Sequence, residues 1–106
     1  MLMMKRRYSG GILIFLATVA PLSAAHDDQT LSRNLAATCS NCHGTDGRAV
    51  AASGIDALAR ADREQLLQKL RDYRSGAKPS TVMQQLLKGY SERELELIVR
   101  YFATRP

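Results

Sequence analysis

Tryptophan is absent from this chain of 106 residues, and other aromatic side chains are few. Only two cysteines are present, which excludes both a disulfide-rich scaffold and a four-cysteine zinc site. No apolar run reaches the roughly twenty residues that a membrane-spanning helix needs. A G-x-G-x-x-G fingerprint is also missing, so no flavin or nicotinamide domain is expected. The length allows one small domain at most.

Residues 1–25 have the layout of a secretory signal peptide. Basic side chains at positions 5–7 are followed by an apolar run of about nine residues at 12–20, and a stretch of small residues ends at Ala25. We expect cleavage after Ala25, export to the periplasm and a mature domain of residues 26–106. An uncleaved anchor is disfavoured, because the apolar run is too short to span a bilayer.

Charge gives no sign of a nucleic-acid partner. The whole chain has 15 basic and 10 acidic residues. Three of the basic residues and none of the acidic ones lie in the expected signal peptide, which leaves 12 against 10. No basic run, and no basic stripe interleaved with aromatic residues, is found in residues 26–106.

The mature part is expected to be all-helical. Asp27 or Asp28 can cap a first helix that runs into Cys39. A loop with several glycines follows. Further helices are expected from the Asp62 capping box to Ser75, from about Val82 to Lys88, and from the Ser91 capping box onward with an apolar face that reaches Phe102. The expected helix ends are marked by caps and glycines, namely Asp62 with Gln65, Ser75-Gly76, Gly89, and Ser91 with Glu94.

Residues 39–43 read Cys-Ser-Asn-Cys-His, the C-x-x-C-H signature of covalent haem attachment. On the end of a helix, residues three and four apart share a face, so both thiols and the imidazole can be presented to one flat macrocycle. Each thiol can add to one haem vinyl group, and the imidazole then lies under the iron. We therefore expect one covalent haem c, attached through Cys39 and Cys42, with His43 as an axial ligand of the iron.

Three other interpretations of the two cysteines are weaker. A thioredoxin-like pair of cysteines needs a strand before the motif and a surrounding βαβ fold, and the sequence pattern predicts neither. A structural zinc site needs two more ligands at suitable spacing. A plain disulfide leaves His43 without a role.

Met83 is the expected second axial ligand of the iron. Three of the four methionines fall within the first four residues, so it is the one methionine of the expected mature domain. It lies after the Pro79 loop and before the last helix, where the chain can return to the far side of the haem. A methionine that fills a gap in the core is the ordinary alternative. The other possibilities for the second axial position of the iron are His26, a lysine or no protein ligand.

A thioether ligand favours ferrous iron and raises the reduction potential, and a filled sixth position leaves no site for oxygen or peroxide. The sequence therefore predicts an electron-transfer protein rather than an enzyme. A haem ligand sensor or a peroxidase-like protein would require a labile sixth position.

The chain resembles the small class I bacterial c-type cytochromes over nearly all of residues 28–105. That resemblance implies three to five helices wrapped round one covalent haem, with the first and last helices crossing near Leu35 and Phe102. It also implies that one haem edge is exposed and passes the electrons. It rests on residues 39–44, 66–76, Met83 and 101–103.

A narrower resemblance is to the cytochrome subunit of flavocytochrome c sulfide dehydrogenases. It is carried by residues 73–83, by Lys88-Gly89-Tyr90-Ser91 and by Glu94. It implies that a separate flavoprotein subunit oxidises sulfide and that this chain accepts the electrons one at a time. A free-standing diffusible carrier that serves other redox proteins is the alternative.

Asp56 stands where such cytochromes usually have a proline whose carbonyl accepts a hydrogen bond from the proximal histidine. The sequence here reads Ile55-Asp56-Ala57-Leu58-Ala59-Arg60. The backbone carbonyl of Asp56 can still take the His43 Nδ1 proton, because a proline offers only its carbonyl to that bond. The fixed backbone angle of proline is lost. The Asp56 carboxylate either tunes the haem or points to solvent.

Overall fold

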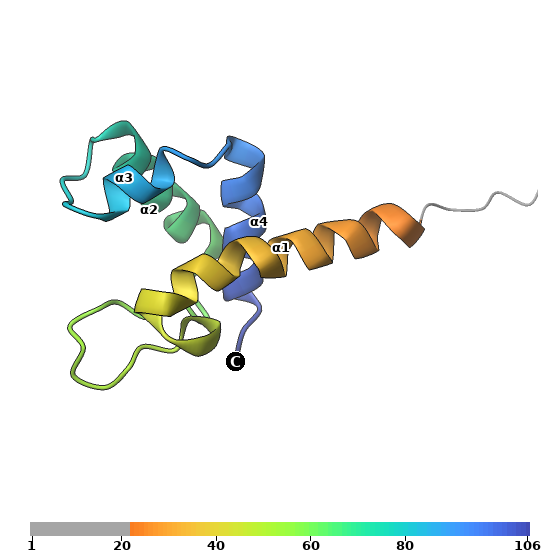
Figure 1. Cartoon of the computed structure of the whole chain (residues 1–106), viewed down its shortest axis with the longest axis horizontal. Helices are drawn as coiled ribbons and strands as arrows, with labels where there is room; N and C mark the ends of the chain where they lie inside the picture. Colours follow the sequence, from red (N-terminus) through yellow and green to blue (C-terminus); the bar gives the residue numbers. More distant parts are fainter. Residues whose placement is uncertain (1–21) are drawn as a thin grey trace, which may run out of the picture.

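The computed structural model of the chain describes residues 22–106 and is all-helical (Figure 1). No strand occurs in this part of the chain, which confirms the predicted fold class. Most of the predicted signal peptide lies in residues 1–21, outside the described residues. The elements are α1 (Leu22–His43), a 3-10 turn η1 (Thr45–Gly47), α2 (Arg63–Ser75), α3 (Met83–Leu87) and α4 (Glu92–Ala103).

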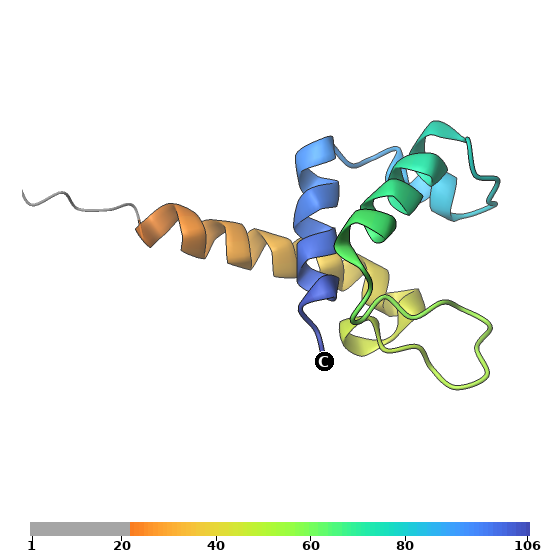
Figure 2. The same cartoon turned by 180° about the vertical axis from the view of Figure 1, so that it is seen from behind.

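The first and last helices cross. Figure 1 and Figure 2 both show α4 lying against the middle of α1, while the first turns of α1 extend beyond the rest of the protein. At the crossing, the buried Ser32 hydroxyl donates a hydrogen bond of 2.5 Å to the carbonyl of Leu97. Leu35 packs against the core that contains the fully buried Phe102. The predicted crossing near Leu35 and Phe102 is therefore confirmed.

Apolar side chains at helical spacing make the core. Those of α4 lie three and four residues apart and so form one stripe along the helix. Helix α2 contributes Leu66 and Leu70, four residues apart, and the short α3 contributes the buried Leu87 and the half-buried Met83. The main buried cluster consists of Ala36, Leu66, Leu70, Leu87, Leu95, Ile98, Val99 and Phe102.

Both predicted ends of α2 and the predicted start of α4 are confirmed. The Asp62 carboxylate accepts a hydrogen bond of 2.9 Å from the Gln65 amide, and Gly76 ends α2 in the left-handed conformation. Ser91 and Glu94 form the reciprocal capping box of α4. These caps satisfy backbone amides that a helix cannot pair internally.

The predicted start of the first helix is wrong. The structure begins α1 at Leu22, so Asp27 and Asp28 lie inside the helix and do not cap it. Leucine and alanine at positions 22–25 are strong helix formers and extend the helix upstream. Asp28 instead pairs with Arg93 of α4 at 2.5 Å. No helix within residues 22–106 is long and apolar enough to cross a membrane.

The loop after α1 folds back onto α4. Gly44 has φ of 86°, and a β-carbon there would lie 1.8 Å from the Arg48 carbonyl oxygen, so the turn requires glycine. The amides of Leu58 and Ala59 both donate to the Gly47 carbonyl, at 2.8 and 3.0 Å. Further on, the Arg60 amide donates to the Phe102 carbonyl at 3.1 Å. These bonds hold the far end of the loop against Gly47 and against the last turn of α4.

Candidate functional site: an apolar cavity beside the C-x-x-C-H motif

The last turn of α1 carries the three side chains of the motif. Cys39 and Cys42 are both free thiols, the first half-buried and the second exposed, and His43 is half-buried. Burial raises the pKa of the Cys39 thiol, with a smaller contribution from the neighbouring Cys42. Both thiols are therefore available as free S–H groups on the last turn of α1.

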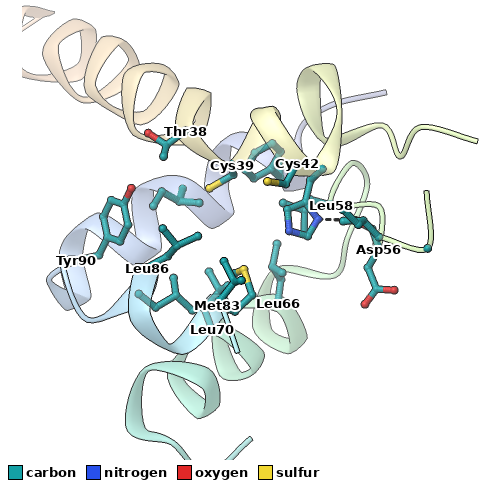
Figure 3. A pocket seen from close by; sticks show the side chains of 17 residues that line it. Thr38, Cys39, Cys42, Asp56, Leu58, Leu66, Leu70, Met83, Leu86 and Tyr90 are labelled. Carbon is teal, nitrogen blue, oxygen red and sulfur yellow. Dashed lines mark hydrogen bonds between the residues drawn. The ribbon is translucent and has the colours of Figure 1, made fainter. Parts of the chain in front are cut away.

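His43 is held by the loop that follows. Its Nδ1 lies 2.6 Å from the backbone carbonyl oxygen of Asp56 (dashed in Figure 3). Because a carbonyl only accepts, Nδ1 carries the proton and Nε2 keeps its lone pair free to bind a metal. This confirms that the Asp56 carbonyl can take the place of a proline carbonyl.

The Asp56 carboxylate points away from the cavity in Figure 3. Its side chain is 74% exposed and pairs with Lys69 Nζ at 3.1 Å. A hydrogen bond from Lys69, with the lysine's charge, lowers the pKa of the Asp56 carboxyl. Of the two alternatives for this side chain, the structure favours the solvent-facing one, with an ion pair that the sequence did not predict.

A cavity of about 370 Å³ opens beside the motif. Figure 3 shows the Cys39 and Cys42 side chains on one side of it and Met83 on the other. Leu66 and Leu70 of α2 lie beside Met83 and make that wall apolar. The lining residues are Thr38, Cys39, Cys42, His43, Gly54, Ile55, Asp56, Leu58, Leu66, Leu70, Val82, Met83, Leu86, Leu87, Tyr90, Ile98 and Phe102.

Met83 is the first residue of α3 and is held there by the preceding loop. The Ser80 hydroxyl accepts a hydrogen bond of 2.8 Å from the Met83 amide. The half-buried Met83 side chain packs against the core and also lines the cavity. The structure thus brings all four predicted site residues to one cavity. His26, the alternative ligand, lies exposed in the first turns of α1 and does not line it.

The residues present fit a haem c group. The Cys39 and Cys42 thiols lie on one side of the cavity and the Met83 thioether on the other (Figure 3), and the His43 imidazole lines the same cavity. Within residues 22–106, no three His, Cys, Asp or Glu side chains gather in a way that could hold a bare metal ion. The donor set therefore suits an iron that is already held in a macrocycle.

A second hollow of about 280 Å³ continues along α2. It shares His43, Leu66, Leu70 and Met83 with the main cavity, and it adds Lys69 and Tyr73. The apolar spacing of α2 predicted a buried face, but it did not show that this face would line a cavity. Lys69 carried no sequence signal, because its partner lies 13 residues away in a loop.

Three basic side chains that could pair with haem propionates are engaged with other groups. Arg74 pairs with Glu92 at 2.7 Å, and the Arg48 Nε donates to the Pro106 carbonyl at 3.3 Å. Lys78 lies over the Tyr73 ring at 5.1 Å. None of these three side chains lines the main cavity. Tyr90 does line it.

A helical fold that gathers C-x-x-C-H and a methionine round one apolar cavity is the arrangement of a small c-type cytochrome. No protein-family model matches the chain. The chain is 38% identical over 68 residues to the cytochrome subunit of sulfide dehydrogenase from Chlorobaculum tepidum, a match that covers 64% of this chain and 60% of that protein.

Two further relatives are similar. The thiosulfate dehydrogenase electron acceptor of Stutzerimonas stutzeri is 32% identical over 71 residues, which is 67% of this chain and 33% of that protein. Cytochrome c4 of Azotobacter vinelandii is 28% identical over 102 residues, which is 88% of this chain and 48% of that protein. The chain thus spans between a third and three fifths of the lengths of these relatives.

These comparisons confirm that the chain resembles the class I c-type cytochromes and, among them, the cytochrome subunit of sulfide dehydrogenase. The relatives are cytochromes and an electron acceptor by name. Their names support haem-based electron transfer rather than catalysis as the role of this chain.

Proposed function

We propose that this chain is a periplasmic electron-transfer protein with one covalent haem c, and that it serves as the cytochrome subunit of a sulfide-oxidising flavoprotein. The single observation that carries the haem assignment is the meeting of Cys39, Cys42, His43 and Met83 round one apolar cavity. When bound, haem c supplies reversible one-electron chemistry at its iron.

Each residue of the cavity has a distinct task in this proposal. The thiols of Cys39 and Cys42 attach the group by adding S–H across two vinyl C=C bonds, a step that needs no oxidant. His43 offers the Nε2 lone pair, because its Nδ1 proton is held by the Asp56 carbonyl. Met83 offers a thioether from the opposite wall, which favours the reduced iron.

The apolar walls keep water away from the bound group. Leu66, Leu70 and Phe102 are buried and line the cavity. Excluding water disfavours a net charge at the iron centre and reduces the rearrangement of solvent during each electron transfer. With His43 and Met83 both bound to the iron, the site would suit carrying electrons and would leave no position for oxygen or peroxide.

The name of the Chlorobaculum relative supports a sulfide dehydrogenase as the partner. That the partner is a flavoprotein is implied by the sequence resemblance to the flavocytochrome c subunit. Oxidation of sulfide to the level of elemental sulfur releases two electrons, so this chain would accept them in two single-electron transfers. The chemistry on sulfide would belong to the partner. Residues 1–25 would direct export as a cleaved signal peptide, which leaves residues 26–106 as the haem domain.

A free-standing carrier is the second candidate. It is favoured by the Stutzerimonas relative, whose name describes an electron acceptor rather than a subunit. Such a carrier would serve several redox proteins by brief encounters rather than by a stable complex.

Expression of the full chain with a cytochrome c maturation system tests the haem assignment. We expect a haemochrome spectrum of the c type and a mass that equals residues 26–106 plus one haem. A protein without covalent haem would contradict the proposed function.

Affinity purification of the tagged chain from the periplasm of its own host separates the two candidates. Recovery of a flavin-containing chain that reduces this protein when sulfide is added would support the subunit. Recovery of an isolated monomer that still exchanges electrons with other redox proteins would support the free carrier instead.

A further inference from the structure

The middle of the loop that positions His43, residues 50–57, is hydrogen-bonded to the rest of the protein at one residue, while backbone bonds of Leu58 and Ala59 hold the segment that follows. Every residue from 48 to 57 is exposed. Among the hydrogen bonds of the described residues, the two that join residues 50–57 to the rest of the protein both involve Asp56. The other bonds of this segment, such as that from the Ser53 amide to the Val50 carbonyl, stay within it.

Asp56 uses two different groups for these bonds. Its backbone carbonyl accepts the Nδ1 proton of His43 at 2.6 Å, and its carboxylate accepts from Lys69 Nζ at 3.1 Å. The carboxylate points away from the cavity in Figure 3, so it acts on His43 through the backbone. Nothing in the backbone of an aspartate fixes φ, so a contact from outside the loop adds to the Leu58 and Ala59 backbone bonds in holding the carbonyl in place.

Lys69 offers a firm anchor for that contact. It lies in the middle of α2, a helix of 13 residues that is capped by Asp62 at its start and by Gly76 at its end. Its neighbours Leu66 and Leu70 are buried in the core, which fixes the helix backbone under the lysine. The lysine side chain itself is 40% exposed.

We propose that Lys69 is a positioning residue for His43: its ion pair with Asp56 tethers the loop to α2 and so keeps the Asp56 carbonyl on the histidine Nδ1 proton. This proposal rests on the proposed function, in which His43 binds the haem iron. A second group that holds a metal-bound imidazole sets the ring's tautomer, orientation and basicity. Lys69 would thus control the proximal ligand without touching it.

Hydrogen exchange of the His43 Nδ1 proton in the reduced holoprotein tests the tether. We expect Lys69→Met to speed this exchange by about two- to five-fold, the range for an exposed ion pair. Asp56→Asn, which keeps the carbonyl but removes the charge, should speed it by a similar factor. The double variant should exchange no faster than either single variant, because both changes remove one contact. Lys69→Arg should restore the slow exchange.

The matched control is Lys88→Met, which removes a lysine charge at the end of α3 without touching the loop. A direct effect of charge on the ring proton would move the exchange in opposite directions in Lys69→Met and Asp56→Asn, because the lost charges have opposite signs. The tether would be overturned if the exchange rate changed in opposite directions in Lys69→Met and Asp56→Asn. It would also be overturned if Lys69→Met exchanged at the same rate as Lys88→Met.

The haem content of each variant is measured first by its haemochrome spectrum. If Lys69→Met carries full covalent haem and its His43 Nδ1 proton exchanges as slowly as in the unmodified protein, the tether is contradicted but the proposed function is not. Absence of covalent haem from the unmodified protein contradicts the proposed function, so the two failures are distinguishable.

Discussion

In the proposed function, Met83 would determine which chemistry the cavity supports, because a thioether on the sixth position of the iron separates a carrier from a haem protein that binds gases or peroxide. Its amide is held by Ser80 and its side chain faces the cavity from the wall opposite the two cysteines. A methionine that only filled a core gap would pack in the same place. Substitution distinguishes the two roles.

We expect Met83→Ala to open the sixth position of the iron. Carbon monoxide should then bind the reduced variant rapidly and at least about tenfold more tightly than it binds the unmodified protein, and the reduction potential should fall by on the order of 100 mV. The matched control is Leu86→Ala, which shortens another cavity-lining side chain of α3 that has no sulfur. Equal carbon monoxide affinity in both variants would contradict ligation by Met83.

Gly44 fixes the turn that brings the loop back under His43. We expect Gly44→Ala to lower the free energy of unfolding by about 1–3 kcal/mol, because a β-carbon would meet the Arg48 carbonyl and φ is positive. Gly54→Ala is the control, since Gly54 also has positive φ but nothing lies within 4 Å of its added β-carbon. Denaturant unfolding of the Gly44→Ala and Gly54→Ala holoproteins measures the difference in unfolding free energy. Equal losses in the two variants would show that the structure relieves the contact between the added β-carbon and the Arg48 carbonyl, and would contradict this prediction.

Helices α2 and α4 are joined at their polar edge by Glu92, in the first turn of α4, which pairs with both Arg71 and Arg74 of α2. Hydrogen bonds from Arg71 and then Arg74 hold the pKa of the Glu92 carboxyl below its ordinary value. Such a group adds stability above its unfolded-state pKa, and this stability is lost as the pH falls through the folded-state pKa.

We expect Glu92→Gln to destabilise the protein at neutral pH and to have little effect in strong acid. The curves of unfolding free energy against pH for the two proteins should therefore converge as the pH falls below about 4.5, the ordinary pKa of glutamate. Glu64→Gln, at an exposed position in the first turn of α2, is the control. If the difference in unfolding free energy between the unmodified protein and Glu92→Gln stayed constant with pH, the ion pairs of Glu92 would not be its cause.

The sequence predicted the helices best where a local signal ended them. Asp62, Gly76 and the Ser91–Glu94 pair each act within four residues, so their pattern is readable without the fold. The predicted start of α1 was wrong because good helix formers precede the two aspartates that were expected to cap the helix.

Long-range contacts of the site could not be predicted in the same way. The role of the Asp56 carbonyl followed from a resemblance and from the fact that any backbone supplies a carbonyl. Its partner Lys69 gave no pattern, because that pairing depends on how the loop lies against α2. The cavity-lining role of Leu66 and Leu70 likewise depends on the packing of three helices.

At the scale of the whole molecule, a core of few buried side chains is built round a cavity whose walls are apolar. A domain of this size buries a limited fraction of its surface, and a group that binds only the folded chain adds its binding free energy to stability. The proposed haem would therefore be part of the fold as well as of the function.

We expect the double variant Cys39→Ala with Cys42→Ala, which cannot hold haem covalently, to lose much of its helical circular dichroism. The single variant Cys42→Ala keeps one attachment point and both axial ligands, and should remain largely helical. A fully helical double variant with cooperative unfolding would show that the protein folds without an attached haem.

X-ray absorption at the iron edge of the reduced, exported protein tests the central claim most directly, because it reports the atoms bound to the iron. The account predicts one sulfur ligand and five nitrogen ligands, with the sulfur lost in Met83→Ala and kept in Leu86→Ala. An iron with no sulfur ligand in the unmodified protein, or a sulfur ligand that persists in Met83→Ala, would contradict it.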